Sequence, residues 1–154
     1  MKKILRLLVV ALLAVGSWSC DLTASDDEQV EQLEITTNNI SGSWKLVVWN
    51  GDPLKEGTYV YIDFVRADGT YTMYQNIDSF STRTITGRYA LYIDEELGVA
   101  VLRGNYDHGA GEWNRRYIVE YLTKSEMRLV AMDNADDVSI YERCDIPAEI
   151  VDSK

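Results

Sequence analysis

Side chains capable of acid–base or nucleophilic chemistry are few in this 154-residue chain. His108 is the only histidine and stands in a glycine-rich stretch, and no histidine lies near Cys144 in the sequence. A nucleophile needs a base within hydrogen-bond reach, and the chain has no Gly-x-Ser-x-Gly elbow. The adjacent acids Glu95–Glu96 and Asp136–Asp137 would point to opposite faces of a strand, which favours solvated turn charges over catalytic pairs. The sequence therefore predicts a non-enzymatic protein without a cofactor.

Metal and nucleic-acid binding are also disfavoured. Two cysteines and one histidine are too few for a zinc cluster. The run Asp133–Asp137 offers oxygen ligands, but it lacks the spacing and the glycine of a calcium-binding loop, so we predict no metal site. The formal net charge of -10 opposes binding to a phosphate backbone.

Aromatic residues are more informative, because the chain has 10 tyrosines and 4 tryptophans. They can fill a core, line a cavity for an apolar or amphiphilic ligand, or stack on sugar rings at strand ends, where Trp49 and Trp113 stand. Placement on the predicted strands selects six candidate ligand contacts, which are Tyr61, Tyr71, Tyr74, Tyr89, Trp113 and Tyr117.

The elements that must position these side chains begin near residue 40. From there the chain is rich in strand-forming Val, Ile, Tyr, Thr and Trp, and it has no amphipathic segment of helical length. Strands are predicted near residues 43–49, 58–66, 70–76, 80–93, 98–104, 114–123, 126–133 and 137–144. The fourth region is long enough for two strands, or for one strand bent at Gly87. The pattern predicts an all-β fold of eight or nine antiparallel strands, and periodicity alone does not separate a barrel from a sandwich.

Alternation within the strands predicts which side chains share a face. Val60, Ile62 and Phe64 form one apolar face. The same rule places Leu122 on the face opposite to Val119. Large side chains on both faces of a strand fit a barrel wall.

The first twenty residues follow the pattern of a bacterial secretion signal. A basic start precedes an apolar run over residues 4–15, which is too short to span a membrane. Small residues follow and lead to Cys20. This order resembles the signal of bacterial lipoproteins, which implies a signal peptide over residues 1–19 and lipidation of Cys20. Simple secretion stays open, because Ser17 and Ser19 also suit ordinary signal peptidase.

An acidic tether over residues 20–39 is expected after the signal, because acids are frequent there and basic residues are absent. Ser25 and Glu28 match a capping box, which predicts a short helix over residues 26–34. The acids after Cys20 resemble the export signal that directs lipoproteins of Bacteroidota to the cell surface. A plain acidic spacer is the alternative.

The ordered motifs of the body resemble lipocalins, and in particular the lipocalin-like lipoprotein domains of Bacteroidota. The motifs are Gly42-x-Trp44, Tyr61–Phe64, Asp68–Tyr71, Gly87–Tyr89, Tyr117–Thr123 and Met127–Leu129. The resemblance implies an up-and-down calycin-type barrel over residues 40–146, followed by a tail over residues 147–154. In lipocalins an arginine near the last strand packs on the tryptophan of the first motif. Arg143 holds that place here, and its exposure to solvent is the alternative.

The function that this resemblance implies is non-catalytic binding of a small hydrophobic or amphiphilic molecule. It also implies an outer-membrane lipoprotein on the periplasmic or cell-surface face. The body is short for a lipocalin, so a barrel filled by its own side chains is the alternative. Such a protein would act as an inhibitor or as an accessory subunit of an envelope complex, and its acidic surface would favour a basic partner.

Overall fold

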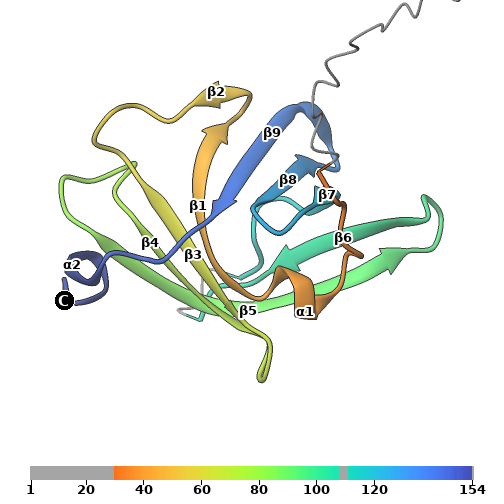
Figure 1. The fold of residues 1–154 in the computed structure, drawn as a ribbon, viewed down its shortest axis with the longest axis horizontal. Helices are drawn as coiled ribbons and strands as arrows, with labels where there is room; N and C mark the ends of the chain where they lie inside the picture. The colour runs from red at the N-terminus through yellow and green to blue at the C-terminus, as the bar shows by residue number, and fades with distance from the viewer. Residues whose placement is uncertain (1–29, 108–110, 154) are drawn as a thin grey trace, which may run out of the picture.

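The strands of this computed structural model, which describes residues 30–107 and 111–153, form one closed antiparallel sheet (Figure 1). They are β1 (Gly42–Trp49), β2 (Asp52–Pro53), β3 (Val60–Val65), β4 (Thr70–Gln75), β5 (Arg83–Asp94), β6 (Val99–Gly104), β7 (Tyr117–Leu122), β8 (Glu126–Ala131) and β9 (Asn134–Arg143). From β3 onward each strand pairs with the next, and β1 pairs with both β3 and β9, which closes the barrel. Strand β2 adds a short extra ladder beside β1. The predicted all-β, up-and-down barrel is confirmed.

The turn between β3 and β4 shows how local chemistry sets the register. Gly69 has a φ of 67°, a conformation that glycine adopts without steric cost. The carboxylate of Asp68 accepts a hydrogen bond from the Thr70 N–H at 3.2 Å. The turn therefore pairs Phe64 with Tyr71, and both side chains enter the core.

The long fourth region is a single strand, β5, that changes partner along its length. Its residues 83–88 pair with β4, and its residues 89–94 pair with β6. Gly87 stands at this change. A Cβ there would lie 1.9 Å from the Asn105 carbonyl oxygen and 2.8 Å from the Tyr71 ring, so only glycine admits the crossing chain.

Strand β7 departs from simple alternation. Its register against β8 shifts between Val119 and Tyr121, where a β-bulge leaves Glu120 exposed. Because the bulge adds one residue, Val119 and Leu122 both point into the core. The prediction that placed Leu122 on the opposite face is wrong for this reason.

The segment before β1 runs across one end of the barrel without forming the predicted helix. Residues 30–34 are not helical, and residues 26–29 lie outside the described residues. The Leu33 N–H instead donates to the Leu122 carbonyl at 2.8 Å. The Leu33 side chain packs against the core, so contacts with the barrel hold this segment in an extended conformation.

A single turn of helix, α1 (Thr37–Ile40), closes this end of the barrel. The Thr36 hydroxyl caps it by accepting a hydrogen bond from the Asn39 N–H at 3.2 Å. Ile40, its last residue, and Trp44 are fully buried, and the Trp44 indole N–H donates to the Ile40 carbonyl at 2.7 Å. We call this the closed end.

Arg143 covers the closed end from the last residue of β9. Its guanidinium lies 4.0 Å from the centroid of the Trp44 ring, and it donates to the Ser41 and Asn39 carbonyls at 2.8 and 2.7 Å. A Cβ on Gly42 would lie 2.8 Å from this guanidinium. The structure therefore brings Gly42, Trp44 and Arg143 together.

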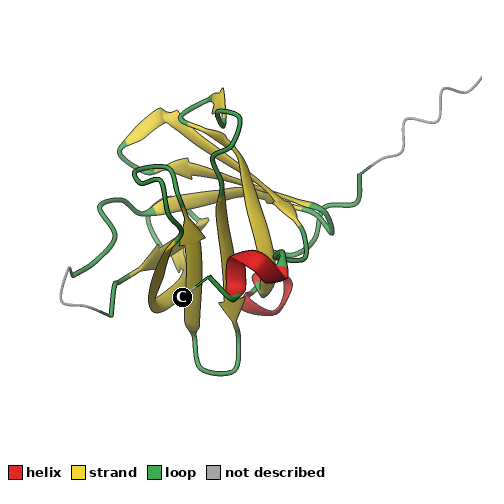
Figure 2. Ribbon diagram, turned by 90° about the vertical axis from the view of Figure 1, so that its left-hand side faces the viewer, coloured by secondary structure: helices red, strands yellow, loops and turns green. Residues whose placement is uncertain are grey.

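The tail after β9 carries a second short helix, α2 (Ala148–Val151), on the β3–β4 side of the barrel (Figure 1). In the view of Figure 2 strands and connecting loops make up nearly all of the body. Of the helices in the described residues, none has both the length and the apolar content needed to cross a membrane.

Candidate functional site

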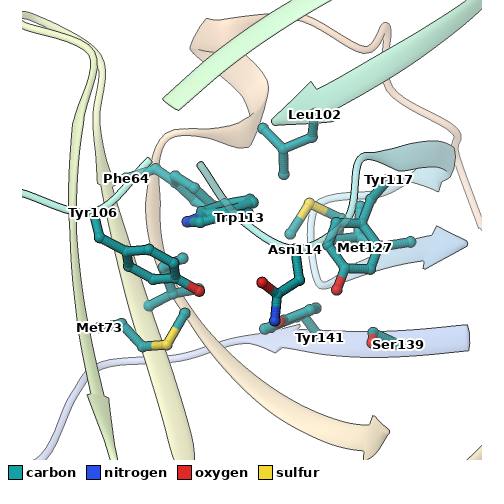
Figure 3. Close-up of a pocket in the computed structure, with 12 residues that line it drawn as sticks. Phe64, Met73, Leu102, Tyr106, Trp113, Asn114, Tyr117, Met127, Ser139 and Tyr141 are labelled. Carbon is teal, nitrogen blue, oxygen red and sulfur yellow. The ribbon is translucent and has the colours of Figure 1, made fainter. Parts of the chain in front are cut away.

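The barrel holds a cavity of about 170 Å³ between its walls (Figure 3). The residues around it come from β3, β4 and β6 to β9 and from the β6–β7 loop, and they are Ile62, Phe64, Met73, Leu102, Tyr106, Trp113, Asn114, Tyr117, Met127, Leu129, Ser139 and Tyr141. An engineered protein cavity of about 150 Å³ binds benzene, and drug-sized pockets start near 300 Å³. The space therefore suits a single ring or a short chain.

The floor of the cavity is apolar and tightly packed. Leu102 and Met127 are fully buried, and Phe64 and Leu129 are nearly so. Phe64 also packs edge-on against Tyr89, with ring centroids 4.8 Å apart. The floor offers a ligand dispersion contacts and burial of apolar surface, without groups that need a hydrogen-bond partner.

Uncharged polar groups form the rest of the wall. Figure 3 shows the hydroxyls of Tyr106 and Tyr117 and the amide of Asn114 directed toward the cavity. Ser139 and Tyr141 add hydroxyls from β9. Burial, followed by the negative charge of Asp137, raises the pKa of Tyr117. Burial also raises the pKa of Tyr141, so both phenols stay protonated at neutral pH.

Trp113 enters the barrel through the gap between β6 and β7. These strands share only two paired positions among the described residues, which leaves room for the connecting loop. The Trp113 indole N–H donates to the Tyr71 hydroxyl at 2.8 Å, and that hydroxyl donates to the Asn105 carbonyl at 2.9 Å. Burial raises the pKa of Tyr71 to about 12. The indole thus forms one wall of the cavity and seals the gap.

Gly104 makes this position possible. A Cβ there would lie 2.4 Å from the indole, which is far inside van der Waals contact. Two further contacts hold the ring, since its centroid lies 5.2 Å from that of Tyr71 and 6.4 Å from that of Tyr117.

The six predicted contacts separate into three groups. Trp113 and Tyr117 line the cavity. Tyr71 supports Trp113 from behind, and Tyr89 packs in the core beside Phe64. Tyr61 and Tyr74 form the third group, on β3 and β4.

Tyr61 and Tyr74 do not line the cavity, which corrects their expected position. They face each other across β3 and β4. Because Ile62 and Phe64 occupy the inner face of β3, the alternating Tyr61 must point outward, and its partner Tyr74 points outward with it. Tyr61 lies instead beside Tyr59, with ring centroids 5.5 Å apart.

Ten of the twelve cavity residues are not among the six predicted contacts, and those that could offer a ligand a polar or sulfur contact are Met73, Tyr106, Asn114, Ser139 and Tyr141. Ser139 and Tyr141 could have been found, because they alternate along one predicted strand and share a face. Tyr106 and Asn114 come from a loop, and no periodic signal marks a loop side chain that folds inward.

The reactive residues of the sequence have no part in this cavity. Cys144 follows β9 outside the barrel, and burial raises the pKa of its thiol. Cys20 and His108 lie outside the described residues. Within residues 30–107 and 111–153, no group of three or more His, Cys, Asp or Glu side chains is placed to hold a metal ion.

The sequence model of the lipocalin-like domain matches residues 40–129, more than half of the chain. The chain belongs to the lipocalin-like domain family. Two solved structures share the fold of this lipocalin-like domain. A lipocalin-like protein from Bacteroides uniformis is 18% identical, with a TM-score of 0.51, and the match covers 69% of this chain and 99% of that one. A protein from Bacteroides uniformis solved by NMR is 17% identical, with a TM-score of 0.52, and the match covers 77% of this chain and 99% of that one.

At such identity these neighbours support the fold of the lipocalin-like domain and carry no assignment of a ligand. No curated protein sequence matches the chain.

Proposed function

We propose that this lipocalin-like domain binds one small, mainly apolar molecule in the barrel cavity and catalyses no reaction on it. The cavity itself carries the proposal, because it combines an apolar floor with a rim of uncharged hydrogen-bonding groups. Asn114 lines the cavity and is exposed to solvent, which provides a path for a ligand. We call this end of the barrel the open end.

The expected affinity follows from size. A single ring buries on the order of 150–200 Å², which contributes about 4–5 kcal/mol at 25 cal/mol per Å². Loss of translational and rotational freedom offsets much of this gain. Apolar contact alone therefore gives binding no tighter than the millimolar range, and tighter binding needs the polar groups of the rim.

Native mass spectrometry of the protein purified from its host tests the proposal. The expected result is an added mass of about 100–250 Da, the range of a one-ring molecule for this volume, that is lost under denaturing conditions. Titration with 2-phenylethanol, followed by amide NMR shifts at Asn114 and Ser139, provides the second measurement. A clean apo mass together with no shift for this probe would overturn the proposal.

A pair of variants on β9 separates cavity binding from surface binding. Ser139→Leu fills the cavity, and Val138→Leu makes a comparable change on the outer face of the same strand. Probe binding should disappear in the first variant and persist in the second. Near-UV circular dichroism reports whether both remain folded.

The second candidate function is an interaction module, which two exposed aromatic side chains favour. Phe80 is fully exposed in the β4–β5 loop, and Trp49 is 45% exposed at the end of β1. Both lie at strand ends opposite the closed end. A partner that protects Phe80 and Trp49, and that dissociates when both become serine, would support this reading.

We also propose that the protein is an outer-membrane lipoprotein anchored through Cys20. The support is the sequence pattern alone. Incorporation of a labelled fatty acid, abolished by Cys20→Ser, is the expected outcome. Release of unlabelled protein from wild-type cells would show simple secretion instead.

A further inference from the structure

Asp137 places a buried carboxylate with an unpartnered oxygen beside the cavity. The residue is only 7% exposed. Its Oδ2 forms an ion pair with the Arg115 guanidinium, whose nearest nitrogen lies 3.0 Å away. Its Oδ1 is buried and has no hydrogen-bond partner among the described residues. A buried acceptor left without a donor is unfavourable, and a water molecule or a donor on a ligand would satisfy it.

The position of Asp137 on β9 relates this oxygen to the cavity. Asp137, Ser139 and Tyr141 alternate along the strand and are therefore on its inner face. Ser139 and Tyr141 line the cavity. The charge of Asp137 also helps to raise the pKa of both Tyr117 and Tyr141, as expected for neighbouring groups. Asp137 is not one of the lining residues, but it lies on the same face of β9 as Ser139, two residues toward the open end.

The charges at this end favour a cation over an anion. The Arg115 guanidinium is shared between Asp137 and Asp133, whose Oδ1 lies 3.4 Å away. One positive group therefore faces two carboxylates. None of the residues that line the cavity carries a formal charge that could compensate. An anionic ligand would face this excess in a low-dielectric space.

We propose that the ligand of this cavity is a small amphiphilic amine whose ammonium group donates to Asp137 Oδ1. Its apolar part would fill the space above Phe64 and Met127, and the phenol hydroxyls of Tyr117 and Tyr141 would flank the polar group. The inference rests on the proposed ligand-binding function and narrows its ligand class. A charge-assisted hydrogen bond of this kind is stronger than a neutral one, and it supplies the affinity that apolar contact alone lacks.

Four probes of similar size test the choice of polar group. Phenethylamine, 2-phenylethanol and phenylacetate place an ammonium, a hydroxyl and a carboxylate on the same ring, and ethylbenzene lacks a polar group. Calorimetry on the purified protein measures each dissociation constant, and amide NMR shifts at Ser139 locate the binding. We expect phenethylamine to bind about 10-fold or more tightly than 2-phenylethanol, and phenylacetate to bind most weakly.

Two matched variants test the residue. Asp137→Asn keeps the shape and removes the charge, so the preference for phenethylamine over 2-phenylethanol should disappear. Asp136→Asn makes the same chemical change on the neighbouring exposed residue and should preserve the preference. Thermal unfolding of each variant establishes that it is folded. If Asp137→Asn does not fold, the wild-type ranking of the probes decides.

The outcomes separate this inference from the function beneath it. Equal binding of phenethylamine and phenylacetate, or a preference that survives Asp137→Asn, overturns the amine proposal and leaves ligand binding intact. Binding of ethylbenzene alone does the same. Failure of all four probes, together with a clean apo mass, overturns the ligand-binding function itself.

Discussion

The contact between Gly104 and Trp113 predicts a strong and specific effect of adding a single methyl group. The Gly104→Ala methyl would lie 2.4, 2.6 and 2.8 Å from three indole atoms. The backbone at Gly104 cannot move away from the indole, because Gly104 pairs with Tyr89 of the neighbouring strand β5. The indole must therefore move by about 1 Å or more, since apolar atoms make ordinary contact near 3.5–4.0 Å.

That displacement removes identifiable interactions. The 2.8 Å hydrogen bond from the indole to Tyr71 contributes about 1 kcal/mol. The edge-on contact with the Tyr71 ring contributes about 0.5–1.5 kcal/mol. If the indole stays in the barrel, overpacking against the new methyl group adds about 1–3 kcal/mol of strain. We expect Gly104→Ala to lower the free energy of unfolding by about 2–4 kcal/mol.

A double-mutant cycle with Trp113→Ala assigns the cause. In the Trp113→Ala background the methyl of Gly104→Ala enters empty space, and its cost should fall to about 0.5 kcal/mol or less. Urea unfolding followed by far-UV circular dichroism measures all four proteins, because most of that signal comes from the backbone and the transition midpoint can be read in each protein separately. The reasoning is refuted if Gly104→Ala costs the same in both backgrounds, or if it leaves the wild-type stability unchanged.

Three further predictions concern other parts of the molecule. Arg143→Met removes the hydrogen bonds and the stacking on Trp44 at the closed end. It should lower the free energy of unfolding, measured in urea, by about 2–3 kcal/mol. Arg103→Met, on the exposed side of β6, serves as the control and should change the free energy of unfolding by less than about 1 kcal/mol. The pKa of Tyr71 is raised to about 12 in the folded protein, so the unfolded state loses this proton at a lower pH. The stability of the fold should therefore decrease as the pH rises from about 10 to about 12. A urea midpoint that stays constant over this range would contradict the assignment. The raised pKa of the Cys144 thiol should make its reaction with a disulfide reagent at pH 8 slower than that of a free cysteine peptide and faster as the pH rises; equal rates at pH 8 would show an exposed, unperturbed thiol.

The strands were predictable because their signals are local. β-Branched and aromatic runs separated by tight turns mark all eight barrel strands within a few residues of their observed bounds, and Asp68–Gly69 marks a hairpin directly. Strand β2 is too short to leave a pattern. The face of Leu122 was not predictable, since the bulge at Glu120 depends on the partner strand β8 and not on the sequence of β7.

The cavity was predictable only in part, and for a different reason. Alternation identifies the inner face of a strand once one of its residues is known to be buried. Applied to β3 and β9, it would have excluded Tyr61 from the cavity residues and included Ser139. The approach of Trp113 to Gly104 and the inward fold of Asn114 depend on where the β6–β7 loop crosses the barrel. Such positions arise from contacts between segments distant in sequence, which no local period encodes.

Residues 30–36, which precede α1, are fastened to the closed end of the barrel. Leu33 is bonded to the Leu122 end of β7, and Glu31 forms an ion pair at 3.1 Å with Lys124 in the adjoining turn. Tyr117 and Asn114, at the other end of that strand, border the cavity. The described chain therefore begins at the closed end, and the polar residues that border the cavity lie at the opposite end of the barrel.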